Sequence, residues 1–335
     1  MSMRESTERS RGTGTPKAVI AFMDAIRPPD HPKSRGEKLM AKLKEKYGYE
    51  FLLLDSDTMS RALKAPIDLV VARAPLYHAA GYYLSRLRGI PLINDFRDPY
   101  TLFYTRRFFT RLFLLHRNLS DAISVSMRAY IEEFRLDPEK AFYNPNAAPV
   151  EWTQLPDREP KEQICFVGNL HNRHYNFPLM MEAFRRLIEV KPRLKLVIGG
   201  DGPLLPEIRT LAVERGVSSS VQFLGKVPYE DVPGLISDSL FGLALNPWLG
   251  QKHIEYAACG RPCVGIGGRL DAEAIPWIVT ADPTPSDVAE KMATLVFDEK
   301  TRTYLGELGR KDVRAFYNWD KMAELWHEVI QGLVS

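Results

Sequence analysis

Short apolar runs alternate with longer amphipathic stretches along most of this chain. In its first part the runs cover residues 18–23, 51–54, 67–72, 92–95 and 122–125. Runs of four to six such residues are typical of buried strands, and the stretches between them have the periodicity of amphipathic helices. Strands that alternate with helices predict a parallel sheet with helices packed on both faces.

The same alternation starts again after a polar segment rich in proline. Residues 144–161 lack apolar periodicity, and the later apolar runs cover residues 164–167, 194–198, 221–224, 241–245 and 263–266. A chain of 335 residues is long enough for two domains of roughly 150 residues each. We predict a cleft with hinge motion between two such domains. The expected boundaries are a tail at 1–16, a first domain at 17–145, a linker at 146–161, a second domain at 162–315 and a closing segment at 316–335.

Charge and cysteine content argue against several classes of function. Lys and Arg number 45 against 42 Asp and Glu. The chain therefore lacks the large excess of positive charge that would predict a nucleic-acid partner. Three cysteines without paired spacing indicate reduced thiols, with neither a disulfide framework nor a metal site. The first sixteen residues are polar and no apolar run reaches the ~20 residues of a spanning helix. We therefore expect a cytoplasmic protein without a resident metal or cofactor.

A nicotinamide dehydrogenase is the first parallel-sheet enzyme to consider. Its G-x-G-x-x-G fingerprint follows the first strand of the sheet. Here the nearest glycine cluster, Gly199-Gly200-Asp201-Gly202, follows an interior strand and lacks the third glycine of the fingerprint. The sequence therefore does not favour a dinucleotide-binding enzyme.

Four motifs in the second half occur in a specific order. They are Cys165-Phe166-Val167-Gly168-Asn169, the strand that ends in Gly199-Gly200-Asp201-Gly202-Pro203, the strand 221–227, and the segment 252–264 with its Glu255-Tyr256-Ala257-Ala258-Cys259-Gly260 core. This series resembles the retaining family-4 glycosyltransferases, over about half of the chain. The resemblance implies the GT-B architecture, an α/β fold of two Rossmann-like, doubly wound parallel-sheet domains that face each other across a cleft. The second domain then holds the nucleotide-sugar donor, and the closing segment 316–335 crosses back to the first.

The segment around Glu255 is the strongest site candidate. In the family, the glutamate at this position accepts hydrogen bonds from the ribose hydroxyls, a task that suits an ionised carboxylate. The loop before it, which includes Gly250 and Gln251, leads into a helix whose amino end suits a diphosphate. Lys252 adds a positive charge beside that end. An exposed helix glutamate and a solvated lysine are the alternatives for these two residues.

Two positions depart from the family pattern. A further glutamate that many members use for the donor sugar is replaced by Pro247, and the phosphate-binding arginine after Gly168 is replaced by Asn169. We predict that Arg173 takes over that role and stabilises the departing nucleotide, with a water-facing loop arginine as the alternative.

The resemblance places base recognition around residues 225–229, which include Val227 and Tyr229. Backbone groups read the base there, so the sequence does not separate UDP from GDP. In the first domain of the family, the loop before the first helix brings small residues near the donor phosphates, and Ser34, Arg35 and Gly36 are the candidates for that role.

Acceptor contacts are expected from the first domain. Asp95, Arg97 and Asp98 follow a predicted strand at the sheet edge where ligands gather. Asp95 is a candidate to orient or deprotonate an acceptor hydroxyl, and Arg97 and Asp98 are candidates to bind the acceptor. A buried Asp–Arg pair that fixes the loop is the alternative. Residues 99–119 carry arginines among aromatic residues and predict contact with an anionic membrane surface, unless their apolar side packs on the sheet.

The predicted function is transfer of a hexose-type sugar from a UDP- or GDP-sugar to a glycan, lipid-linked or small-molecule acceptor. The resemblance implies retention, with attack on the face from which the nucleotide leaves. A catalytically silent GT-B module and a sugar-nucleotide epimerase are the alternatives, because the fold does not determine the chemistry.

Overall fold

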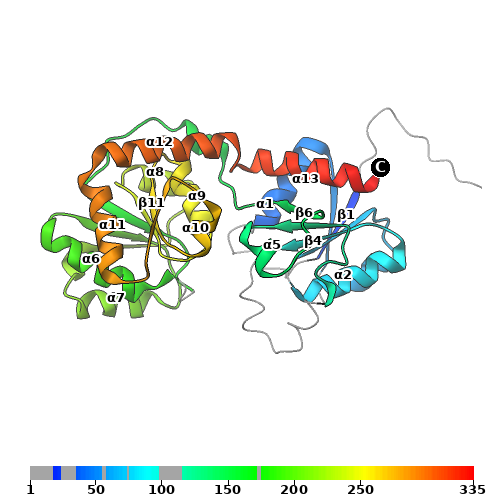
Figure 1. Cartoon of the computed structure of the whole chain (residues 1–335), viewed down its shortest axis with the longest axis horizontal. Helices are drawn as coiled ribbons and strands as arrows, with labels where there is room; N and C mark the ends of the chain where they lie inside the picture. The colour runs from blue at the N-terminus through cyan, green and yellow to red at the C-terminus, as the bar shows by residue number, and fades with distance from the viewer. Residues whose placement is uncertain (1–17, 24–34, 55–57, 74, 98–114, 172–174) are drawn as a thin grey trace, which may run out of the picture. The chain divides into compact units, whose positions relative to one another are not determined.

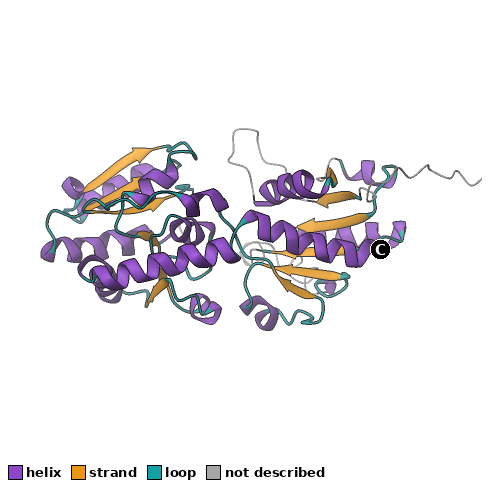
Figure 2. Ribbon diagram, turned by 90° about the horizontal axis from the view of Figure 1, so that it is seen from above, coloured by secondary structure: helices purple, strands orange, loops and turns teal. Residues whose placement is uncertain are grey.

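The computed structural model describes residues 18–23, 35–54, 58–73, 75–97, 115–171 and 175–335. Its strands form two six-stranded sheets with the orders β2-β1-β3-β4-β5-β6 and β12-β11-β10-β7-β8-β9. Helices lie on both sides of the strands (Figures 1 and 2). The predicted α/β fold with two doubly wound sheets is confirmed.

The first sheet begins with β1 to β4, which pair in parallel. Its strands are β1 (Val19–Met23), β2 (Glu50–Leu54), β3 (Leu69–Arg73), β4 (Leu92–Phe96), β5 (Ala122–Val125) and β6 (Ala141–Tyr143). The helices along this part of the chain are α1 (Arg35–Tyr47), η1 (Met59–Leu63), α2 (Pro75–Arg88) and α5 (Ala129–Glu133).

The second sheet is parallel at all five of its strand pairs. Its strands are β7 (Gln163–Val167), β8 (Lys195–Gly199), β9 (Val221–Gly225), β10 (Gly242–Ala244), β11 (Cys263–Ile266) and β12 (Ile278–Ala281). The helices of this part are η2 (Val150–Gln154), α6 (Phe177–Val190), α7 (Leu205–Glu214), η4 (Ser218–Ser220), α8 (Val232–Ser237), α9 (Gln251–Ala258), α10 (Arg269–Glu273), α11 (Pro285–Phe297), α12 (Glu299–Ala315) and α13 (Trp319–Val334).

The chain divides into two compact units. The first comprises Met1–Ile123 with Trp326–Ser335, and the second Ser124–Leu325. In the first unit, the Tyr49 hydroxyl hydrogen-bonds His327 Nδ1 at 2.8 Å and accepts a bond from Gln331 Nε2 at 3.0 Å, so the end of α13 is tied to this unit. The predicted domain boundaries stay predictions, because the division falls inside β5 and α13. The predicted tail 1–16 lies outside the described residues.

The core of the second unit explains why β7 is central. Three consecutive residues of β7, Ile164, Cys165 and Phe166, are completely buried. Such a run is expected only where helices cover both faces of the sheet. On one face, α6 begins after Asn176, whose side chain caps the helix by accepting a hydrogen bond from the Leu179 amide at 3.2 Å.

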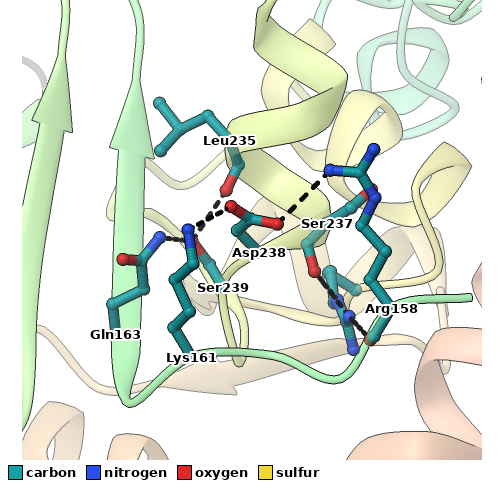
Figure 3. A network of polar contacts seen from close by, with 8 residues as sticks. Arg158, Lys161, Gln163, Leu235, Ser237, Asp238 and Ser239 are labelled. Atoms are coloured by element: carbon teal, nitrogen blue, oxygen red, sulfur yellow. Dashed lines mark hydrogen bonds and ion pairs between the residues drawn. The ribbon is translucent and has the colours of Figure 1, made fainter.

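Polar contacts hold the beginning of β7 against the end of α8 (Figure 3). Lys161 Nζ lies 2.6 Å and Arg158 Nη1 3.5 Å from the Asp238 carboxylate. Mainly the hydrogen bond from Lys161 lowers the pKa of Asp238 below its ordinary value. Gln163 Nε2 donates to Ser239 Oγ at 3.1 Å. These bonds fix where β7 starts, and therefore where its carboxyl end reaches the candidate site.

Candidate functional site

The order of strands in the second sheet reverses between β7 and β10. β8 and β9 continue on one side of β7, and β11 and β12 continue beyond β10 on the other. β7 and β10 pair at Cys165 and Gly242. In open parallel sheets, ligands bind at the carboxyl ends of the strands beside such a switch point. The candidate site is therefore expected just beyond Val167 and Ala244.

Tyr256 of α9 fills the space between the two strands. Its hydroxyl accepts a hydrogen bond from the Val167 amide at 3.1 Å and donates one to the Leu243 carbonyl at 3.2 Å. A side chain on Gly242 would collide with its ring. Burial raises the pKa of Tyr256 well above its ordinary value, so the hydroxyl stays protonated and can donate. Tyr256 therefore pairs the Val167 amide and the Leu243 carbonyl where the two strands separate. A buried polar group left unpaired would cost about 1–3 kcal/mol.

Glycines form the floor of the site where β7 and β8 end. The Gly168 amide donates to the Gly199 carbonyl at 2.8 Å, and the Gly200 amide donates to the Gly225 carbonyl at 2.7 Å. A Cβ atom on Gly200 would collide with the carbonyl oxygen of Gly168. The loops after the two strands therefore pack backbone against backbone. Asn169, which follows Gly168, is exposed, and its side-chain oxygen contacts the ring of His171.

Lys252 places a positive charge on this floor. Its Nζ donates to the Tyr175 hydroxyl at 2.9 Å and lies 4.2 Å from the centre of the Tyr175 ring and 5.3 Å from that of Phe166. A Cβ atom on Gly168 would collide with Nζ, so the ammonium group lies directly over the end of β7. Among the residues that the structure describes, no carboxylate forms an ion pair with Lys252. Such an ammonium at the carboxyl edge of the sheet is a suitable partner for an anion.

The amino end of α9 lies beside this lysine. Gly250 precedes the helix in an extended conformation, and its amide donates to His253 Nδ1 at 3.1 Å. Burial lowers the pKa of His253 to about 4, which keeps the ring neutral and its Nδ1 available as an acceptor. Because an α-helix carries partial positive charge at its amino end, this arrangement adds to the attraction of Lys252 for an anion.

Glu255 lies three residues beyond Lys252 on the same helix. Residues with this spacing are neighbours, with roughly 5–6 Å between their Cβ atoms. Glu255 Oε1 accepts hydrogen bonds from Gln251 Nε2 at 2.7 Å and from the Tyr229 hydroxyl at 3.0 Å. Within the described part of the chain, no hydrogen bond reaches Oε2. One carboxylate oxygen is thus held by protein donors while the other is available to a ligand hydroxyl.

Two further candidates line the same region. The Tyr229 ring lies 5.1 Å from the Trp152 ring, and burial, followed by the charge of Glu255, raises the pKa of Tyr229. Its phenol therefore stays protonated and donates to Glu255. Val227 packs beside Gly199 at the end of β8. The structure thus brings two groups of candidates together around α9: Gly168 with Lys252, and Glu255 with Gln251 and Tyr229.

Comparison with known proteins shows which family the residues around this site resemble. Residues 153–312 match the model for glycosyl transferases group 1. This part of the chain is similar to that family. The finding confirms the sequence resemblance at the level of group 1, and residues 153–312 are called the group 1 domain below. Retention stays a prediction.

Individual relatives match over part of their length. The phosphatidylinositol N-acetylglucosaminyltransferase gpi3 subunit of Schizosaccharomyces pombe is 23% identical over 208 residues, which are 60% of this chain and 45% of that protein. The D-inositol 3-phosphate glycosyltransferase of Corynebacterium jeikeium is 28% identical over 184 residues, 51% of this chain and 43% of that protein. The chain therefore spans less than half the length of these curated relatives.

A solved structure shares the fold over nearly the whole chain. Anabaena Alr3699/HepE, crystallised in complex with UDP, superimposes with a TM-score of 0.75 at 13% identity and covers 94% of this chain and 100% of its own. At this identity the likeness supports the two-sheet architecture alone.

Sequence reasoning missed two tyrosines of the group 1 domain. Tyr175 holds the ammonium group of Lys252, although the two residues are 77 positions apart. Tyr256 joins β7 to β10 from its place on α9. Tyr256 directly follows Glu255 in the motif, yet neither the motif nor its spacing indicates which backbone groups its hydroxyl meets.

The three cysteines are free and buried. Burial raises the pKa of each thiol, to about 12 for Cys165, so they are protonated and weakly nucleophilic at neutral pH. In the part of the chain that the structure describes, no group of three or more His, Cys, Asp or Glu residues is placed to hold a metal ion. Within the same residues, no helix is both long and apolar enough to span a membrane.

The acceptor candidates lie in the first unit. Arg97 Nε donates to both oxygens of Asp95, at 2.9 and 2.7 Å, and Arg73 Nε lies 3.9 Å from the same carboxylate. Burial alone would raise the pKa of Asp95, but the neighbouring arginines hold it below its ordinary value. Asp95 and Arg97 thus form the buried pair that was the alternative to direct acceptor contact.

Gly36 packs closely against Arg73 and Phe22, where a side chain would be crowded. Ser34, Asp98 and Arg173 lie outside the described residues.

Proposed function

We propose that this protein transfers a sugar from a nucleoside-diphosphate sugar to an acceptor. The observation that carries the proposal is the placement of Lys252 and Glu255 one helical turn apart, beside the glycine floor at the β7–β10 switch point. A nucleoside diphosphate has an anionic diphosphate and a ribose diol only a few bonds apart, which matches this pair of groups. The group 1 domain supports the same function.

Chemically, the lysine acts on the leaving group. Negative charge grows on the diphosphate as the bond to the sugar breaks, and a positioned ammonium stabilises that charge. Glu255 binds the ribose and holds the donor in place, which lowers the entropic cost of reaching the acceptor. We propose that the sugar is hexose-type and that the reaction proceeds with retention and without a metal. Arg173 remains the proposed second cation for the diphosphate.

The acceptor is proposed to carry a phosphate group. Phosphatidylinositol and D-inositol 3-phosphate appear in the names of the two relatives above, and both compounds contain phosphate. A lipid-linked acceptor would place the enzyme at the cytoplasmic face of a membrane. Asp95, Arg97 and Asp98 stay the proposed acceptor-side residues, with Asp95 acting through its ion pair with Arg97.

The test is a transfer assay with UDP-glucose, UDP-N-acetylglucosamine and GDP-mannose, each offered with inositol phosphate or with phosphatidylinositol in vesicles. We expect one donor to be consumed only when acceptor is present. The product is expected to show the donor's own anomeric configuration by proton NMR. Conversion of a donor without acceptor would favour an epimerase instead, and an inverted anomer would contradict retention.

A catalytically silent module is the second candidate, and Pro247 is the observation that favours it. Pro247 stands where many members of the resembled family have the glutamate that holds the donor sugar. If nucleotides bind but none of these donors is consumed with any offered acceptor, this second function replaces the first.

A further inference from the structure

A buried histidine occupies the capping position of α9. The Gly250 amide donates to Nδ1 of His253, three residues further on, at 3.1 Å, and the His253 ring is completely buried. A side chain at this helical position that accepts a bond from the amide before the helix forms half of a capping box, and it is usually Glu or Gln. In α9 an imidazole ring makes this bond instead.

The next helix of the group 1 domain makes the same bond with a charged side chain. α10 follows Gly268, whose amide donates to Asp271 Oδ2 at 2.6 Å. The spacing and the glycine donor are those of α9, but the acceptor is a carboxylate. An acidic side chain in the first turn normally stabilises a helix, because it faces the partial positive charge of the amino end. The first turn of α9 contains no Asp or Glu and therefore lacks this stabilisation.

The surroundings of the His253 ring keep it neutral. Burial lowers the pKa of His253 to about 4, and the positive charge of the adjacent Lys252 acts in the same direction. A Cβ atom on Gly265 of β11 would lie 3.2 Å from Nε2, so the ring fills the space that this glycine leaves open. Because the Gly250 amide can only donate, Nδ1 is the unprotonated nitrogen and Nε2 carries the proton.

Buried side chains also fix the loop between β10 and α9. The Asn246 side chain is buried, and its Nδ2 donates to the Trp248 carbonyl at 2.7 Å. The Asn246 amide donates to the Ala244 carbonyl at the end of β10, also at 2.7 Å. Together with the bond from Gly250 to His253, these contacts hold the loop at both ends. The backbone amides in the first turn of α9 are therefore set in place before an anion binds, which is the arrangement that stabilises its charge most effectively.

Building on the proposed function, we propose that His253 is a positioning residue of the donor site, which fixes the amino end of α9 without placing a negative charge beside the donor diphosphate. A carboxylate at position 253 would accept the same hydrogen bond. Its charge, however, would offset the attraction that Lys252 and the helix end exert on the diphosphate. Because its ring is completely buried, His253 acts through Gly250 rather than by touching the ligand.

The test compares three substitutions of His253 by calorimetric titration with inorganic pyrophosphate at about pH 8, where a carboxylate beside a helix amino end is ionised. His253→Asn keeps a neutral acceptor for the Gly250 amide, so its affinity should stay within about threefold of the wild type. His253→Asp has the same shape with a negative charge, and its affinity should fall at least about tenfold. His253→Leu removes the acceptor, and its affinity should fall about fivefold because the loop is no longer held.

Uridine and guanosine provide a readout that separates positioning of the diphosphate from a general loss of structure. They lack the diphosphate, so the nucleoside that binds the wild type should bind all three variants equally well. Equal pyrophosphate affinity of His253→Asn and His253→Asp would overturn the proposal, as would a parallel loss of nucleoside binding.

Nitrogen NMR of the wild type adds a test that needs no substitution. Nδ1 of His253 should be unprotonated and Nε2 protonated between about pH 6 and 8, and a charged ring in this range would also overturn the proposal. If the wild type binds neither UDP nor GDP, the proposed function fails and the role of His253 fails with it. If the wild type binds one of them and His253→Asp binds it equally well, only the role of His253 fails.

Discussion

Replacing Lys252 by alanine is expected to lower kcat for sugar transfer about 100-fold or more while the melting temperature stays nearly unchanged. The ammonium group of this lysine lies directly over the end of β7. Its Nζ donates a hydrogen bond to the Tyr175 hydroxyl at 2.9 Å. Removing one preorganised group that stabilises transition-state charge typically costs ~10²–10³ in kcat. Alanine favours helix, so α9 should form normally in the variant.

Two companion variants sharpen this test. Lys311→Ala removes an exposed lysine of α12 and should leave kcat at the wild-type value. Tyr175→Phe keeps the aromatic ring beside the ammonium but removes its hydrogen bond, so kcat should fall only several-fold, about the effect of 1 kcal/mol. Turnover of Lys252→Ala within about threefold of wild type would remove the lysine from the proposed chemistry.

The second large effect is expected from Glu255→Gln, in binding of nucleotides. Gln251 and Tyr229 hold Oε1 of Glu255, and Oε2 is the proposed acceptor for the ribose hydroxyls, so the substitution keeps the shape and removes the charged acceptor. A hydrogen bond to a charged group contributes about 1.5–3 kcal/mol, which predicts roughly a 10- to 150-fold loss of UDP or GDP affinity. Inorganic pyrophosphate lacks the ribose, so its affinity should not fall. Calorimetric titration measures the affinity for the nucleotide and for pyrophosphate.

The matched control is Glu307→Gln, which makes the same change at an exposed glutamate of α12 away from the switch point. It should bind nucleotides like the wild type. Dideoxynucleotides provide a ligand-side control, because they lack the ribose hydroxyls and should bind the wild type and Glu255→Gln almost equally. If Glu255→Gln lowers the affinity for pyrophosphate as much as for UDP, the substitution acts through the diphosphate and the ribose role is wrong.

Apolar periodicity predicted the two sheets well because most of their strands are buried on both faces. Ile164, Cys165 and Phe166 of β7, for example, form a continuous apolar run, which is typical of a strand inside a parallel sheet. β6 was not anticipated, because its three residues are half-buried and follow the polar residues 137–140 without a clear pattern. β12 was also missed, because two of its four residues are only half-buried, unlike those of the equally short β5 and β11.

The sequence predicted best those site residues that lie close to one another along the chain. Glu255, Gln251 and Lys252 stand on one helical segment, so a motif could place them together. Tyr175 was not found because its role depends on Lys252, far along the sequence. For Asp95 and Arg97 the sequence left two roles open, since neighbouring charges at a strand end suit both a ligand and each other. Burial of both side chains shows that they pair with each other, which spacing alone does not, and their role toward an acceptor stays a prediction.

The most direct test of the donor site is the melting temperature of the wild type with a panel of nucleoside diphosphates and their sugars. A ligand at 100 times its Kd stabilises the native state by about 2.7 kcal/mol, which corresponds to a rise of roughly 5 °C or more for a unit of this size. We predict such a rise with UDP or GDP species, and a much smaller one for Glu255→Gln and Lys252→Ala. If no nucleotide or nucleotide sugar raises the melting temperature of the wild type, the β7–β10 switch point is not a donor site and the central claim is wrong.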